Sequence, residues 1–308
     1  MKRRAAMAAL LGAAGCQGGG PLSVAEAMPA APPGTAMRPL GVLSLDEAQL
    51  GAEGLSGLHV APDLTLTAIG DRGRWCRARL VLAADGAPLA LEAPRSGPLR
   101  DLVGTPLPRS LAGDAECLAA LPDGSWLVGF ERMHRIWRYR RSDGRAEAVR
   151  TPRELVGAPS NAGLESLAVL ADGRWLAIAE GQPAPGEAGA RLAWIGGPGG
   201  WRALPYRPAP GHDPSDLCPL PDGGALVLER RFGLPDLFTA RIARLAPPGP
   251  SPARLEGVEV ARLAPPLPSD NWEGISAFRH GGRELVAVVS DSNGMVFQRT
   301  LLMVLALG

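Results

Sequence analysis

A short segment recurs five times along the chain, and this repeat constrains the fold more strongly than any other feature of the sequence. Residues 116–131 and 165–180 align without a gap, and the copy at 215–229 is one residue shorter. Two more divergent copies cover residues 56–71 and 273–291. Repeats that begin about 50 to 60 residues apart and contain several short strands are typical of a β-propeller, in which each repeat forms one blade.

The three most similar copies have the pattern of a β-hairpin. In each of them an apolar run leads into Asp-Gly, and a second apolar run follows. Asp-Gly favours a tight turn because glycine readily adopts the positive φ angles that such turns require. The first four units contain enough strand-like runs for four strands each, whereas the last unit contains three.

A further strand-like run at residues 40–45 precedes the first repeat. Pairing of this N-terminal strand with the last blade would close the ring and protect the edges of the sheets. We therefore predict an all-β chain that forms a single β-propeller of five four-stranded blades, closed by an N-terminal strand. Six blades are the alternative if the long first and fourth units contain additional strands.

The N-terminus has the pattern of a secretory leader. A basic start precedes an uncharged apolar stretch at residues 5–15, which is too short to span a membrane. The residues before Cys16 resemble a bacterial lipobox, in which the cysteine is lipidated. We expect a signal peptide at residues 1–15, of the lipoprotein type, a flexible tether rich in Gly, Ala and Pro at 16–38, and the propeller domain at 39–308. The protein would be exported to the periplasm and would touch the membrane only through a lipid on Cys16.

A second small-residue cleavage site, at residues 25–27, keeps cleavage without lipid attachment open as an alternative. The nearly balanced charge argues against nucleic-acid binding, because 32 basic and 31 acidic side chains give a net charge of +1. We expect a monomer that acts on a small molecule. Three cysteines, Cys76, Cys117 and Cys218, have no metal-binding spacing and are interpreted as buried thiols. A Cys76–Cys117 disulfide is the alternative that an exported location would permit.

The repeat places acidic residues at two phases. The first phase, at the start of the innermost strand, contains Ser56, Glu116, Glu165, Asp216 (shifted by one residue) and Glu273. The second phase, after the next strand, contains Asp71, Glu131, Glu180, Glu229 and Asp291. In a propeller these positions lie near the central channel, so the carboxylates would repel one another unless arginines, a metal ion or both were present. Oxygen ligands favour Ca²⁺ or another hard divalent cation such as Mg²⁺ over zinc.

Arginine follows three of the second-phase acids, whereas Asp291 is followed by a serine and Asn293. This asymmetry would let the channel mouth hold an anion beside a metal ion. We predict metal ligands at Glu116, Glu165, Glu273 and Asp291, with the first three also as catalytic candidates. We predict substrate-binding side chains at Arg72, Arg132, Arg230 and Asn293. In the alternative interpretation the acids cap turns or form salt bridges between blades.

Three ordered motifs carry a resemblance to a known family. They are residues 53–58 leading to 71–73, residues 165–167 with 171–173, and residues 271–275 leading to 290–293. Over roughly residues 40–305 the chain resembles the phytase-like domain family, described as "esterase-like activity of phytase". The resemblance implies an exported propeller that hydrolyses phosphoric or carboxylic esters. The alternative is a non-catalytic, lipid-tethered propeller that binds a ligand or a protein.

Overall fold

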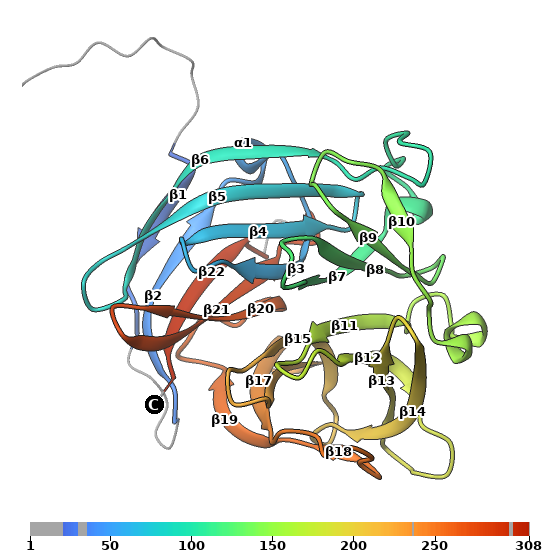
Figure 1. Cartoon of the computed structure of the whole chain (residues 1–308). Coiled ribbons are helices and arrows are strands. Elements are labelled where there is room, and N and C mark those ends of the chain that lie inside the picture. The colour runs from blue at the N-terminus through green and yellow to red at the C-terminus, as the bar shows by residue number, and fades with distance from the viewer. Residues whose placement is uncertain (1–20, 30–35, 236, 296–297, 308) are drawn as a thin grey trace, which may run out of the picture.

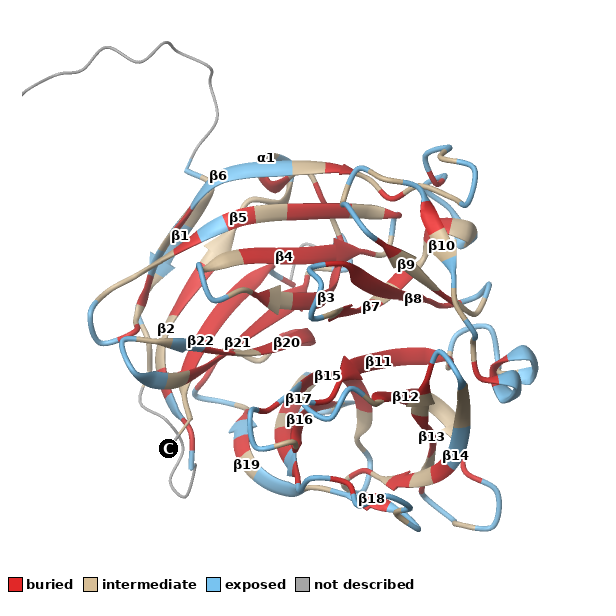
Figure 2. Ribbon diagram, viewed as in Figure 1, coloured by how far each residue is buried: buried red, intermediate tan, exposed pale blue. Residues whose placement is uncertain are grey.

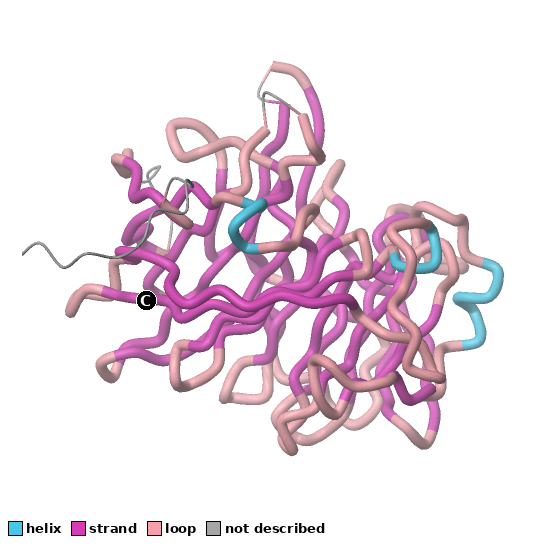
Figure 3. Tube along the Cα trace, turned by 90° about the horizontal axis from the view of Figure 1, so that it is seen from above, coloured by secondary structure: helices cyan, strands magenta, loops and turns pink. Residues whose placement is uncertain are grey.

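The computed structural model describes residues 21–29, 36–235, 237–295 and 298–307. The predicted signal peptide and the predicted lipidation site, Cys16, lie outside these residues. Within the described part of the chain, no helix is both long enough and apolar enough to cross a membrane. The helical segments of the described residues are α1 (Glu47–Leu50) and the 3₁₀ turns η1 (Leu111–Gly113) and η2 (Arg153–Gly157), which lie in connecting loops (Figure 3).

The strands form five sheets that correspond to the repeats, and within each blade neighbouring strands run antiparallel. Blade 1 contains β3 (Leu55–Val60), β4 (Thr65–Gly70), β5 (Arg74–Leu82) and β6 (Pro88–Pro98). Blade 2 contains β7 (Ala115–Ala120), β8 (Trp126–Phe130), β9 (Arg135–Tyr139) and β10 (Ala146–Ala148). Blade 3 contains β11 (Leu164–Val169), β12 (Trp175–Pro183), β13 (Arg191–Gly197) and β14 (Gly200–Arg207). Blade 4 contains β15 (Asp213–Pro219), β16 (Ala225–Gly233), β17 (Leu237–Leu245) and β19 (Val258–Leu263).

The fifth blade is built from both ends of the domain, as the sequence predicts. Its inner strands are β20 (Asn271–His280), β21 (Arg283–Asp291) and β22 (Leu301–Ala306). β2 (Arg38–Leu45) pairs antiparallel with β22, and β1 (Ser23–Glu26) adds to the outside of β2. This pairing joins the blue N-terminal strand to the red C-terminal blade in Figure 1. The prediction of closure by an N-terminal strand is therefore confirmed.

The innermost strands of the five blades form a closed ring. β3 contacts β7, β7 contacts β11, β11 contacts β15, β15 contacts β20, and β20 returns to β3. The long fourth unit does not supply a sixth blade, because its extra strand, β18 (Leu255–Glu256), pairs parallel with β14 of blade 3. The described residues thus form a five-bladed β-propeller.

Apolar side chains fill the space between each pair of neighbouring blades. The inner strands are buried along most of their length, as the red segments of Figure 2 show. Trp126 and Trp175, which occupy equivalent positions in two repeats, are each 4% exposed and belong to these cores. The three described cysteines are buried free thiols, so the disulfide alternative is not formed.

Candidate active site at the channel mouth

A β-bulge at the same position of every blade sets apart one residue of the innermost strand. In each blade the pairing between the first and second strands shifts register near the start of the first strand. The unpaired residues at these shifts include Ser56, Glu116, Glu165, Ser215 and Glu273. Bulges commonly re-aim a side chain next to a functional site. Here the three glutamates come close enough for each to affect the ionisation of another.

A second set of side chains lies closer than the bulge residues to one end of the central channel, which we call the mouth. In blades 1 to 3 the residue of this set donates its backbone N–H to the residue just before the innermost strand. In blades 4 and 5 it pairs with the first residue of the innermost strand. The residues of this set are Asp71, Glu131, Glu180, Arg230 and Asp291. Blade 4 therefore carries an arginine at the position where the other four blades carry an acid.

The sequence alignment of the fourth blade is wrong by one residue, and the pairing of β15 with β16 corrects it. Ser215, not Asp216, occupies the bulge, and Arg230, not Glu229, occupies the second position. The Asp216 carboxylate accepts backbone N–H groups of Leu217 and of Ile275 in the next blade, at 2.8 Å each. This carboxylate thus joins two blades through backbone hydrogen bonds and has a structural role, although it forms neither the turn cap nor the salt bridge of the alternative interpretation.

Glu229 also lies outside the mouth. It is fully buried, pairs with Arg241 at 2.9 Å and accepts the hydroxyl of Tyr206 and the backbone N–H of Ala209. These contacts occupy both carboxylate oxygens. Glu229 is therefore a structural residue of blade 4, although its place in the repeat had put it among the channel acids.

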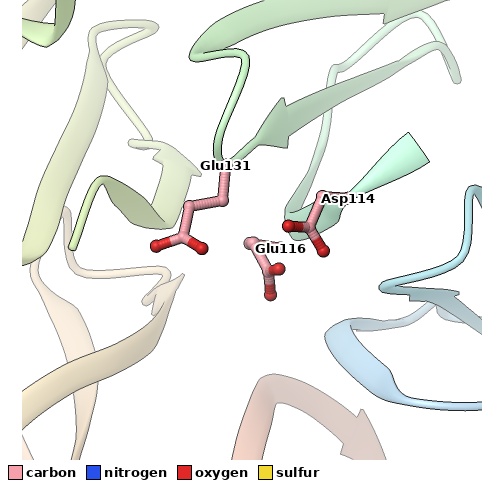
Figure 4. Close-up of side chains that lie close together, drawn as sticks. All are labelled: Asp114, Glu116 and Glu131. Carbon is pink, nitrogen blue, oxygen red and sulfur yellow. The ribbon is translucent and has the colours of Figure 1, made fainter. Parts of the chain in front are cut away.

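Two groups of three carboxylates meet at the mouth. One group consists of Asp114, Glu116 and Glu131, and the other of Glu131, Glu165 and Glu180. Within each group, one oxygen from each residue lies within 4.8 Å of one oxygen from each of the others. Figure 4 shows the first group, in which the side chains of Asp114, Glu116 and Glu131 approach one another from blade 2. Glu131 belongs to both groups and connects blades 2 and 3.

The four predicted metal ligands do not all belong to one of these carboxylate groups. Glu116 and Glu165 fall in different groups, and neither Glu273 nor Asp291 belongs to such a group among the described residues. Asp114 is the ligand candidate that sequence analysis missed. It lies two residues before Glu116, and alternate residues of an extended chain share a face, so the spacing was a usable signal.

The guanidinium of Arg230 lies inside the mouth and already has three hydrogen-bond partners. It donates to Glu180 at 2.7 Å, to the side-chain oxygen of Asn271 at 2.6 Å, and to Glu273. Asn271 in turn donates its amide to Glu273 at 2.7 Å. This arrangement joins blades 3, 4 and 5, and it answers the expectation that arginine would offset part of the carboxylate repulsion.

The other predicted substrate-binding residues lie at the rim. Arg72 pairs with Glu53 at 2.7 Å with half of its side chain exposed, and Arg132 pairs with Asp114 with a side chain 41% exposed. Asn293 is exposed and donates its backbone N–H to Asp291 at 2.8 Å. Arg72 and Arg132 therefore remain accessible to an anion above the mouth, whereas Arg230 lies within it.

Burial and mutual repulsion favour the protonated form of the mouth acids. Burial raises the pKa of Glu116 and of Glu165 well above the usual range, and neighbouring carboxylates add to the effect. Burial raises the pKa of Asp71 to about 7 and that of Asp291 to about 6. The pKa of Glu273 is also raised by burial to about 7, although Arg230 opposes the shift.

The donor set of the mouth fits a hard divalent cation. All candidate ligands are carboxylate oxygens, which Ca²⁺ and Mg²⁺ prefer. One oxygen of Asp71 is buried without a hydrogen-bond partner among the described residues, so the rim also holds an unused acceptor. A bound cation would offset the repulsion that raises the pKa of these acids.

The fold and the mouth define a five-bladed propeller with two linked carboxylate groups and an arginine at one end of its channel. The family model "Phytase-like: Esterase-like activity of phytase" matches residues 51–294, and the chain belongs to this family. The search of curated proteins found no match.

Solved structures similar to the chain include a luciferin-regenerating enzyme, at 10% identity and a TM-score of 0.46, which covers 82% of this chain and 91% of that one. Another is the PQQ-bound aldose sugar dehydrogenase of Streptomyces coelicolor, at 15% identity and a TM-score of 0.43, which covers 82% and 94%.

Proposed function

We propose that the protein is an exported, metal-assisted hydrolase of phosphoric or carboxylic esters, and that the acidic mouth is its active site. The observation that carries the proposal is the pair of carboxylate groups that share Glu131 beside the half-buried Arg230. Membership of the phytase-like family supports an ester as the substrate. The leader-like N-terminus supports export to the periplasm, with Cys16 as the lipid attachment point.

Asp114, Glu116 and Glu131 would hold one cation, and Glu165 and Glu180 offer a second place for it beside Glu131. When bound, Ca²⁺ or a similar ion would lower the pKa of a water ligand and offset the charge that develops on the ester oxygens. The carboxylates themselves fix the position of the ion, because the bulges hold Glu116 and Glu165 on two adjacent rigid strands.

The remaining side chains would bind the substrate and move protons. Arg72 and Arg132 lie at the rim with exposed guanidinium groups, which suit the oxygens of a phosphate ester. Asp71 and Glu273 have pKa values of about 7, so each can hold or release a proton at its carboxylate near neutral pH. Arg230 orients Glu180 and Glu273 and keeps the pKa of Glu273 from rising further.

The test is hydrolysis by the purified protein of p-nitrophenyl phosphate, phytate and short acyl esters, with Ca²⁺, Mg²⁺ or Mn²⁺ and with a chelator. We expect cation-dependent turnover of at least one ester, and a loss of at least about tenfold in Glu131→Gln. Glu259→Gln is the matched control, because Glu259 lies on the outer strand β19 and pairs with Arg262 and Arg241, not with a mouth residue. An absence of turnover under every condition would contradict the hydrolase and leave the binding module as the remaining function.

A further inference from the structure

A cleft between blades 1 and 2 concentrates positive charge away from the acidic mouth. Its volume is about 670 Å³, which is within the range of small-molecule sites. The charged side chains of its lining are Arg77, Arg79, Arg95, Arg140, Arg141 and Asp143. The five arginines and one aspartate give this lining a formal charge of +4 in a chain whose net charge is +1.

The cleft is distinct from the proposed active site. Thr65 and Trp126, which line it, begin β4 and β8, whereas the mouth residues Asp71 and Glu131 follow the other ends of these strands. At about 3.3 Å per residue, the length of β8 places Trp126 roughly 13 Å from the mouth, whereas Trp75, opposite Ile69, lies at the mouth end of the cleft. The cleft therefore goes beyond the proposed hydrolase function and does not depend on it.

Acidic neighbours offset only part of the charge of the blade 1 arginines, since Arg79 lies opposite Glu92 on β6 and Asp63 acts on Arg77. Arg77 and Arg95 lie directly opposite each other on β5 and β6, an arrangement of like charges that destabilises a sheet. Among the described residues, none of Arg77, Arg79 and Arg95 forms an ion pair. Arg77 donates to Thr67 at 3.2 Å and lies over the ring of Trp126 at 4.3 Å, which holds its guanidinium in the cleft.

The two arginines of blade 2 do not neutralise the cleft either. Arg140 pairs with Glu147 and Arg141 with Asp143, but all four side chains are at least 40% exposed. Ion pairs at this exposure are weak and screened by salt, so an anion of higher charge can compete for both arginines.

A tryptophan of the cleft wall also has an unused donor. Trp75 lines the cleft and is only 8% exposed. Its indole N–H has no hydrogen-bond partner within the described part of the chain. Because this N–H is itself buried, Trp75 contributes the shape of the cleft wall and not a donor to a bound anion.

We propose that the cleft between blades 1 and 2 binds a small anion that carries at least two phosphate groups, through Arg77, Arg79 and Arg95. Several phosphates match this site better than a single carboxylate does, because the guanidinium groups come from neighbouring positions of two paired strands. Each arginine can donate two parallel hydrogen bonds to one phosphate. The bound charge also removes the repulsion between Arg77 and Arg95. The phosphates belong either to a soluble compound or to a lipid headgroup.

The test is calorimetric titration of the chelated protein with sodium tripolyphosphate at low salt, where the chelator keeps divalent cations out of the mouth. The same protein is sedimented with vesicles of phosphatidylcholine alone and of phosphatidylcholine with cardiolipin, whose headgroup carries two phosphates. We expect wild-type binding below about 1 mM, and a loss of at least about tenfold in Arg79→Gln/Arg95→Gln, because charge-assisted hydrogen bonds are lost. Tripolyphosphate binding alone identifies a soluble ligand, and vesicle binding that the double variant loses identifies a headgroup.

Arg38→Gln is the matched control, because Arg38 is an exposed strand arginine with no ion pair among the described residues. If the double variant fails to fold, Arg95→Lys keeps the charge, loses the paired donors and should weaken binding on its own. A change in tryptophan fluorescence on binding should diminish in Trp75→Phe. The proposal is overturned if the wild type binds neither probe, if the double variant binds as the wild type does, or if Arg38→Gln loses as much.

Discussion

Glu131→Gln is the sharpest test of the acidic mouth, because Glu131 is the one carboxylate shared by both groups. A cation that binds the folded state alone stabilises it by about 2.7 kcal/mol at a hundredfold excess over Kd. For a propeller of roughly 270 residues the entropy of unfolding is about 0.6 kcal/mol per degree, so this corresponds to a rise in Tm of about 5 °C.

The substitution should act in opposite directions with and without the cation. If the loss of one ligand weakens cation binding about a hundredfold, the stabilisation falls to about 0.4 kcal/mol and the rise in Tm to less than 1 °C. In chelated protein the variant should be at least as stable as the wild type, because one source of carboxylate repulsion is gone. Glutamine can still accept the backbone N–H of Gly163, which donates to Glu131 at 3.3 Å.

The assay is differential scanning calorimetry of both proteins in chelator, and then with excess Ca²⁺, Mg²⁺ or Mn²⁺. Glu259→Gln should keep the full wild-type response, because this carboxylate lies on the outer strand of blade 4 and pairs with Arg262 and Arg241. A wild-type Tm that does not change on addition of any of the three cations would refute the metal site. A variant that loses stability in chelator but keeps its cation response would show that Glu131 is a structural residue.

Three further predictions follow from the same contacts. Arg230→Met should destabilise chelated protein at pH 8 by about 3 kcal/mol, since Glu180 and Glu273 lose their half-buried partner, and by less at pH 6, where Glu273, with a pKa of about 7, can protonate; denaturant titration at the two pH values measures the difference. The Tm of chelated wild-type protein should fall as pH rises from 5 to 8. Asp71, Glu273 and Asp291 have folded-state pKa values of about 7, 7 and 6, so in this window they bind protons that the unfolded chain has already lost. A Tm that rises between pH 5 and pH 8 would contradict the raised pKa values. Gly274→Ala should cost about 1–3 kcal/mol, because its Cβ would lie 2.5 Å from the Ser56 carbonyl oxygen, whereas Gly249→Ala, with open space around it, should leave the Tm unchanged.

The propeller could be predicted from the sequence because its determinants are local and repeated. Each hairpin combines apolar runs with a turn that glycine permits, so every blade can be recognised from one short segment of the sequence. The closing strand was also predictable, since a last unit with three strands leaves an edge that the run at 40–45 can cover. β18 was not predictable, because a two-residue strand that joins blade 3 from the fourth unit has no sequence period.

The acidic mouth was predicted in kind, but its members were not all predicted correctly. Glu116, Glu165 and Glu273 stand at bulges in blades 2, 3 and 5, as their common repeat phase indicates. The cation groups instead depend on Asp114, which lies outside the aligned segment, and on Glu131 and Glu180. Proximity between side chains of different blades depends on the geometry of the bulges and on how the blades pack. Neither can be inferred from the sequence of a single repeat.

The sequence by itself predicted a propeller of five blades, with six as the alternative, the closure of the ring and the concentration of carboxylates near one axis, because these follow from the period of the repeat. Only the tertiary structure decided which carboxylates face the channel. In blade 4 the register of β15 with β16 puts Arg230 where the other blades have an acid, and it sends Glu229 to Arg241 and Tyr206. A shift of one residue reverses the face of a strand on which a side chain lies, so a single register difference exchanges a channel carboxylate for a channel cation.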